Sequence, residues 1–181
     1  YRRILEIKDP KQTWQFTDDL QELAADEAMG NLNGKIAFIY LDGNRFGRIR
    51  EEKCGDGKTL ASFGSTVEER RKDFLMKLLA RASRDKAFKT EKEEIRLETL
   101  LWGGDELEMV VPAWKGWEVL KLFYKTTEKM EFDKVQLTHA GGIVFCGCKA
   151  PIREVRRMAH ELAETTKKEL RGGLDELSNI K

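Results

Sequence analysis

The stretch "LETLLWGGDELEMVVPA" (residues 97–113) decides the fold, because it contains two apolar runs separated by a short glycine-rich turn. Gly103 and Gly104 allow the positive φ angles of a tight turn, so the pattern predicts a β-hairpin. A hairpin does not require the two acids that follow the glycines. Asp105 and Glu106 are therefore either solvated turn residues or part of a metal site.

The segments around this hairpin show the periodicities of further strands and helices. "KIAFIYLD" (residues 35–42) is a nearly continuous apolar run that ends on an acid, as expected of a central strand. Ser65 and Glu68 have the spacing of a helix capping box, and Pro151 suits the first position of a helix. The predicted elements are strands at 2–7, 35–42 and 134–147, the hairpin at 94–113, and helices at 17–29 (with Thr17 as N-cap), 65–88, 113–130 and from 151.

This order of elements predicts an α+β fold with a ferredoxin-like βαββαβ core, in which helices cover one face of an antiparallel sheet. Residues 34–170 are expected to form this domain, after an N-terminal strand and helix extension (1–33) and before a polar tail (171–181). In such a sheet the end of the first core strand lies beside the hairpin turn. Asp42 is therefore expected to lie next to the two acids of the turn.

The composition excludes several classes of protein. The chain of 181 residues has 33 basic and 32 acidic residues and a net charge of +1, so no strong nucleic-acid footprint is expected. No apolar run approaches the length of a membrane span and no signal peptide is evident, so the sequence predicts a cytoplasmic protein. Cys54, Cys146 and Cys148 are expected to be reduced thiols rather than zinc ligands.

Three carboxylates gathered at one sheet edge repel one another unless cations lie between them. Such hard oxygen ligands suit Mg²⁺ or Mn²⁺, and two ions can promote an in-line displacement at phosphorus. A different phosphate motif, "GDGKT" (residues 55–59), ends like a Walker A loop. It lacks the required earlier glycine, because position 52 is Glu, so it is rejected.

Three segments resemble one known superfamily. "GGDEL" (103–107) resembles the signature of GGDEF nucleotidyl cyclases, and "YLDGNRFGRI" (40–49) aligns without gaps on their first acidic motif. Residues 137–168 resemble the last strand and helix of the related polymerase/cyclase palm in the large subunit of type III CRISPR complexes. The resemblance implies a palm domain, either part of such a subunit or a free-standing minimal relative in antiviral signalling.

Departures from the GGDEF pattern favour the CRISPR type of palm, whose known products are cyclic oligoadenylates. Arg50 stands where diguanylate cyclases carry an Asn that reads guanine, and Asn44 replaces a second acid. Residues 96–99 lack the Arg–Asp inhibitory motif. Glu106 replaces the commoner second Asp of the palm motif.

The resemblance also implies roles for individual residues. Asp42 and Asp105 would hold two Mg²⁺ or Mn²⁺ ions, assisted by the Gly43 carbonyl and Glu106, and the three acids would be catalytic. The nucleotide, expected to be ATP, would be joined into a cyclic product with release of pyrophosphate. Its binding residues would be Gly43, Asn44, Arg45, Phe46, Gly103, Gly104 and Lys167.

Several alternatives remain open at this stage. The chain is expected to be a homodimer or a subunit of a larger complex, but a degenerate palm, a diguanylate cyclase or a ferredoxin-like interaction module also fits the sequence. Trp102 suits a buried position or a base stack, and His139 suits a pocket wall or a packing gap. Lys168 competes with Lys167, and His160 is expected to be structural.

Overall fold

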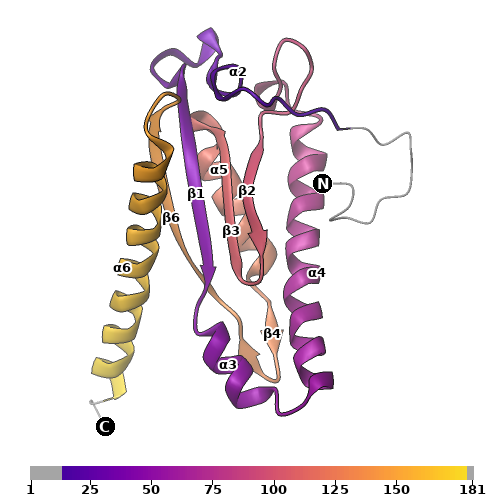
Figure 1. Ribbon diagram of the computed structural model, residues 1–181, viewed down its shortest axis with the longest axis vertical. Helices are drawn as coiled ribbons and strands as arrows, with labels where there is room; N and C mark the ends of the chain where they lie inside the picture. The colour runs from indigo at the N-terminus through magenta and orange to yellow at the C-terminus, as the bar shows by residue number, and fades with distance from the viewer. Residues whose placement is uncertain (1–13, 179–181) are drawn as a thin grey trace.

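The computed structural model describes residues 14–178, whose centre is a four-stranded antiparallel sheet in the order β2-β3-β1-β6 (Figure 1). β1 lies between β3 and β6, so the predicted central strand is confirmed. β2 and β3 form the predicted hairpin. The strands are β1 (Lys35–Gly43), β2 (Glu98–Gly103), β3 (Glu106–Pro112) and β6 (His139–Gly147).

Helices cover both faces of this sheet. α4 (Gly57–Ala82) and α5 (Gly116–Thr127) pack on one face, whereas α2 (Leu20–Ala24) and α6 (Ile152–Ser178) pack on the other. The predicted α+β class, the βαββαβ order and the antiparallel sheet are confirmed. The expectation of helices on a single face holds for the two core helices and is wrong for α6, because β1 is apolar on both of its faces.

The side chains of β1 show how both faces become buried. Ala37, Ile39 and Leu41 point into the core under α4 and α5. The alternate residues of the strand, including Phe38 and Tyr40, point towards α6. Because successive side chains of a strand face opposite sides, a continuous apolar run requires cover on both.

The glycine-rich segment after β1 is more helical than its composition predicts. α3 (Phe46–Lys53) follows β1 directly, and α4 begins at Gly57 rather than near Ser65. Asp56 caps α4 in a capping box with Thr59. The "GDGKT" stretch is therefore a helix start, which explains its resemblance to a phosphate loop that also opens a helix.

The two ends of the chain differ from the prediction in extent. The helix expected at 17–29 is split into α2, capped by Asp19, and a 3-10 segment at Glu27–Leu32. α6 continues to Ser178, beyond the expected start of the tail. The strand expected at 2–7 lies outside the described residues. The short remaining elements are η2 (Lys86–Phe88), η3 (Ala113–Lys115), β4 (Glu131–Phe132) and β5 (Val135–Gln136).

α6 can approach the sheet closely because Gly142 lacks a side chain. A Cβ atom at Gly142 would lie 1.9 Å from the carbonyl oxygen of Ala159, so any other residue would displace the helix. This contact sets the distance between α6 and β6, and the middle of α6 lies beside the end of β1 (Figure 1). No helix within residues 14–178 has the length and apolar composition needed to cross a membrane.

Candidate active site

The end of β1 and the β2–β3 turn meet at one edge of the sheet, as the sequence predicts. Asp42 is the penultimate residue of β1, and Asp105 lies in the turn between Gly103 and Glu106. A Cβ atom at Gly43 would lie 2.8 Å from Cβ of Asp105. Only glycine at position 43 therefore allows the acidic turn to rest against the end of β1.

The turn itself uses one glycine for its geometry. Gly104 has a φ of 49°, a conformation that favours glycine. Gly103 pairs with Glu106 across the hairpin and has no positive φ. The expected positive φ therefore applies to Gly104 alone, and Gly103 leaves open space above the turn.

Lys167 reaches Asp42 from α6. Its ammonium donates hydrogen bonds to the Asp42 carboxylate and, at 3.1 Å, to Glu164. Burial opposes the charged form, but the hydrogen bonds to Asp42 and Glu164 outweigh it, so the pKa of Lys167 is raised. The neighbouring Lys168 is exposed. Of the two candidate lysines, the structure places Lys167 at the acids.

Asp105 and Glu106 have different surroundings. Burial is the main cause of the raised pKa of Asp105. A hydrogen bond from its own backbone N–H lowers the pKa, but the charges of Asp42 and Glu106 raise it further. Glu106 accepts a hydrogen bond of 3.0 Å from the Tyr40 hydroxyl. Among the described residues, Asp42 and Glu106 each accept a hydrogen bond from a side chain, whereas the Asp105 carboxylate has no such partner.

The residues after Asp42 lead into α3. The Asn44 side chain donates to the Thr138 hydroxyl at 3.0 Å, and Arg45 has a left-handed backbone conformation, with φ 61°. Phe46 is 4% exposed and packs edge-on against Phe63. The Phe46 ring therefore packs mainly against other side chains. Its small exposed part forms a wall of one of the two hollows described next.

Two hollows lie on either side of α3. The first, of about 520 Å³, reaches Lys167, and the second, of about 430 Å³, reaches Asp105 and Gly104. The first is lined by Asn44, Arg45, Arg48, Ile49, Glu52, Val135, Gln136, Thr138, His139 and Lys167. The second is lined by Phe46, Gly47, Arg50, Leu60, Phe63, Gly64, Val67, Glu68, Arg71, Gly104 and Asp105.

Among the described residues, the buried side-chain nitrogen and oxygen atoms without a hydrogen-bond partner all belong to residues that line these two hollows. Among residues 14–178 they are Oδ1 of Asn44, Nδ1 of His139, and Nε and Nη1 of Arg71. Most buried polar atoms in proteins have a hydrogen-bond partner, so unpaired atoms clustered around one site mark a place for a ligand, an ion or ordered water. Burial also lowers the pKa of His139 to about 4, so its imidazole is neutral near pH 7.

Arg71 is the site residue that the sequence did not reveal. Arg71 is 9% exposed and lies over the Trp102 ring, with its guanidinium carbon 5.5 Å from the ring centre. Burial lowers the pKa of Arg71, and the charge of Asp105 partly opposes this. Its place between Val67 and Phe74 on the apolar stripe of α4 is the signal that could have identified it.

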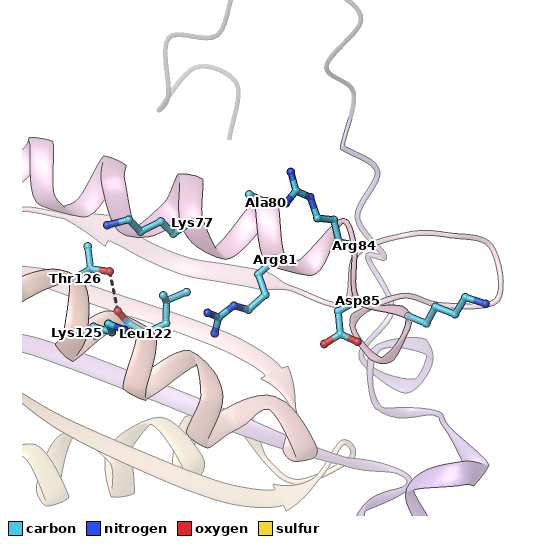
Figure 2. A pocket seen from close by; sticks show the side chains of 9 residues that line it. Lys77, Ala80, Arg81, Arg84, Asp85, Leu122, Lys125 and Thr126 are labelled. Atoms are coloured by element: carbon cyan, nitrogen blue, oxygen red, sulfur yellow. Dashed lines mark hydrogen bonds between the residues drawn. The ribbon is translucent and has the colours of Figure 1, made fainter.

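A third hollow, of about 850 Å³, lies between α4 and α5 (Figure 2). Its lining is basic, but Arg81 pairs with Glu118 and Lys77 pairs with Asp73. It is lined by the C-terminal part of α4, whereas the hollow that reaches Asp105 is lined by the N-terminal half of α4 and by α3, which lies at that end of the helix (Figure 1). This basic hollow is therefore separate from the candidate site.

The acids fit a divalent ion only in part. No group of three or more His, Cys, Asp or Glu residues within residues 14–178 is gathered closely enough to hold a metal ion. Asp42 and Asp105 nevertheless offer hard oxygens on adjoining segments, and their mutual repulsion would be relieved by a cation. This donor set suits an ion such as Mg²⁺, which completes its shell with water and substrate phosphate. The four-residue metal set expected from the sequence remains a prediction.

The fold and the acidic turn define the class: the chain has the fold shared by palm and GGDEF domains. No protein-family model matches the chain, and no curated protein matches its sequence. Solved structures show the likeness instead, which confirms the resemblance found in the sequence at the level of the fold.

Several of these structures contain Csm1. The Csm1–Csm4 cassette in complex with cA4 matches with a TM-score of 0.64 and 18% identity over 90% of this chain and 22% of that chain. The cassette in complex with one ATP matches with a TM-score of 0.64 and 15% identity, covering 87% and 23%. The FimX GGDEF domain from Pseudomonas aeruginosa matches with a TM-score of 0.51 and 13% identity, covering 83% and 85%. The chain thus spans about a fifth of the Csm1 chains that it matches.

Proposed function

We propose that this chain is a palm-type nucleotidyl cyclase that joins ribonucleoside triphosphates, ATP in the first place, into a cyclic nucleotide or oligonucleotide. The observation that supports it most is the meeting of Asp42 and Asp105 between two hollows that contain all the described unpaired buried polar atoms. The likeness to Csm1 structures that contain ATP and cA4 adds support for the substrate class.

Asp42 and Asp105 are the proposed ligands of two Mg²⁺ or Mn²⁺ ions, with the Gly43 carbonyl and Glu106 assisting. Such ions would activate the attacking hydroxyl and neutralise charge on the α-phosphate and the leaving pyrophosphate. The contribution of the chain is mainly positioning and electrostatic stabilisation. Lys167 now pairs with Asp42, and with a cation at Asp42 its ammonium becomes available to a phosphate.

Each hollow is expected to bind a different part of the nucleotide, the base in one and the triphosphate in the other. The hollow of about 430 Å³ has apolar walls from Phe63 and Leu60, which suit a base, and Arg71 lies within it. The hollow of about 520 Å³ brings Arg45, Arg48 and Lys167 together, as a triphosphate requires. A nucleotide that spans the N-terminus of α3 would place its α-phosphate near the acids.

The proposed setting is a homodimer or a larger complex, since each active site must bring two nucleotides together. Csm1 is found in a cassette with Csm4, which supports the larger complex. The proposed biological role is the production of a signal in CRISPR-type antiviral defence.

The test is incubation with each of the four ribonucleoside triphosphates and Mg²⁺ or Mn²⁺, followed by mass analysis of the products. We expect cyclic adenylates and pyrophosphate, reduced more than about a hundredfold in Asp42→Asn and in Asp105→Asn, because these acids hold the charge-neutralising ions. Asp73→Asn is the control, because among the described residues the Asp73 carboxylate pairs only with Lys77, on the surface of α4. A cyclic guanine product would contradict the choice of ATP.

A second candidate is a palm that binds nucleotide without catalysis. It is favoured by the engagement of the acids with protein groups, since Asp42 pairs with Lys167 and Glu106 bonds to Tyr40. Nucleotide binding in calorimetry without pyrophosphate release would support it. If neither Mn²⁺ nor any nucleotide raises the melting temperature, both proposals fail and an interaction module remains.

A further inference from the structure

A chain of polar contacts runs beneath α6 to the acidic turn. It begins at Glu108, whose side chain is 3% exposed and accepts hydrogen bonds of 2.8 Å from Arg156 and His160. Because an ionised carboxylate only accepts, Nε2 of His160 has the hydrogen in this contact. Glu108 therefore fixes the rotation of the His160 ring.

The His160 ring in turn holds Tyr40. The two rings are stacked with their centres 3.7 Å apart and their planes 13° apart. Tyr40 lies opposite Glu108 across the β1–β3 pair, and its hydroxyl reaches along the sheet to Glu106 at 3.0 Å. The imidazole thus prevents the phenol from swinging away from the turn.

The Tyr40 hydroxyl is the donor in this contact, because an ionised carboxylate can only accept a hydrogen bond. The contact of 3.0 Å therefore runs from the Tyr40 hydroxyl to the Glu106 carboxylate. A phenylalanine would fill the same space between β1 and α6, so packing alone does not require the hydroxyl.

We propose that Tyr40, supported by His160, is a positioning residue that holds the Glu106 carboxylate in place for metal binding. This inference rests on the proposed function, because it assumes that Glu106 assists a divalent ion. A glutamate has three rotatable side-chain bonds, and fixing them in advance lowers the entropy lost when the carboxylate binds an ion. His160, expected to be purely structural, acts on the site through Tyr40.

The test is direct titration with Mn²⁺, with free Mn²⁺ followed by electron paramagnetic resonance, on the complete chain without nucleotide. We expect Tyr40→Phe to bind Mn²⁺ about tenfold more weakly than the wild type, as is usual for groups that orient metal ligands. Glu106→Gln should show a similar loss. Tyr40→Phe combined with Glu106→Gln should show no loss beyond that of Glu106→Gln, because the hydroxyl acts through the carboxylate.

Two further variants separate positioning from folding. His160→Phe keeps a stacked ring and should bind Mn²⁺ within about twofold of the wild type, whereas His160→Ala should resemble Tyr40→Phe. Tyr124→Phe is the matched control, since the one hydrogen bond that the Tyr124 hydroxyl donates among the described residues goes to the His139 carbonyl, at 3.5 Å. It should leave the affinity for Mn²⁺ unchanged.

Three results would overturn the inference. Wild-type affinity in Tyr40→Phe would remove the role of the hydroxyl, and a further loss in the double variant would show that it does not act through Glu106. If the wild type binds no Mn²⁺, the proposed metal site fails together with the inference. Wild-type Mn²⁺ binding without any cyclic product would leave the inference standing and contradict only the proposed catalysis.

Discussion

The two faces of the sheet differ in chemistry. The face under α4 and α5 is an apolar core that includes Phe74, Leu78 and Phe123. The face under α6 is apolar near the start of β1 but polar near its end, where Tyr40 and Glu108 are buried. On the second face the Tyr40 hydroxyl donates a hydrogen bond to Glu106 of the turn. On the first face the ionisable group beside the turn is Arg71, in the hollow that reaches Asp105.

This difference suggests that the two faces have different roles, one in the stability of the fold and the other in supporting the candidate site. The burial of apolar side chains stabilises a fold through a non-directional effect, which does not require particular pairs of groups to be aligned. Buried charges require paired partners and, when compared with apolar residues of similar size, often stabilise little or not at all. The polar end of the α6 face is therefore better explained by its contacts with the site than by a need for stability. Three predictions test this division, in order of decreasing effect.

Phe74→Ala tests the apolar face. The Phe74 side chain is fully buried and packs edge-on against Phe123, with ring centres 5.2 Å apart. The cavity should lower the free energy of unfolding by about 3–5 kcal/mol, measured by urea denaturation. Met158→Ala, at a position 47% exposed on α6, is the control and should change stability by less than about 0.5 kcal/mol. Equal effects in the two variants would contradict the core assignment.

His139 tests the region where both faces approach the site. Burial lowers its pKa from 6.5 to about 4, so the unfolded chain takes up a proton between these values and the folded chain does not. The free energy of unfolding therefore includes a contribution from neutral His139 that is complete above pH 6.5. This contribution, about 3 kcal/mol, is lost as the pH falls from 6.5 towards 4.

The measurement is urea denaturation between pH 4 and pH 7. The free energy of unfolding of His139→Phe, which keeps a ring against Phe46 and Phe123, should fall less steeply with acid than that of the wild type. Parallel curves for the two proteins would show that His139 remains accessible to protons in the folded state.

Asp105→Asn should have the smallest effect, and of the opposite sign. The raised pKa of Asp105 means that its ionised form is disfavoured in the folded protein, and this penalty is present above the folded pKa. Removing the charge at pH 7 should therefore raise the free energy of unfolding and the melting temperature, by less than either of the two changes above. A lower melting temperature in calorimetry would show that the carboxylate stabilises the fold and has no unpaired character.

Some elements could be predicted because their signal is local. The hairpin follows from two glycines between apolar runs, and the buried β1 follows from its continuous apolar residues. α3 and the first turns of α4 were missed because glycine and charge dominate residues 43–64. Helix α4 begins at the capping box of Asp56 and Thr59, and not at the similar capping box predicted at Ser65 and Glu68.

The candidate site divides in the same way. Asp42 and the acidic turn were predicted to meet because the order of the strands fixes which ends are neighbours. The burial of Arg71, whose Nε and Nη1 lack hydrogen-bond partners, was not predicted. A charged residue on an apolar stripe ordinarily lies at the solvent-exposed edge of that stripe.

The sequence by itself determined the hairpin, the central strand and the acids at their ends, because each depends on short-range periodicity and on turn chemistry. Only the tertiary structure decided which groups surround those acids. Lys167 lies 125 positions from Asp42, and Glu106 lies 66 positions from Tyr40. Such contacts depend on how closely α6 packs on the sheet, a distance set by the absent side chain of Gly142 and by side-chain packing that no local pattern records.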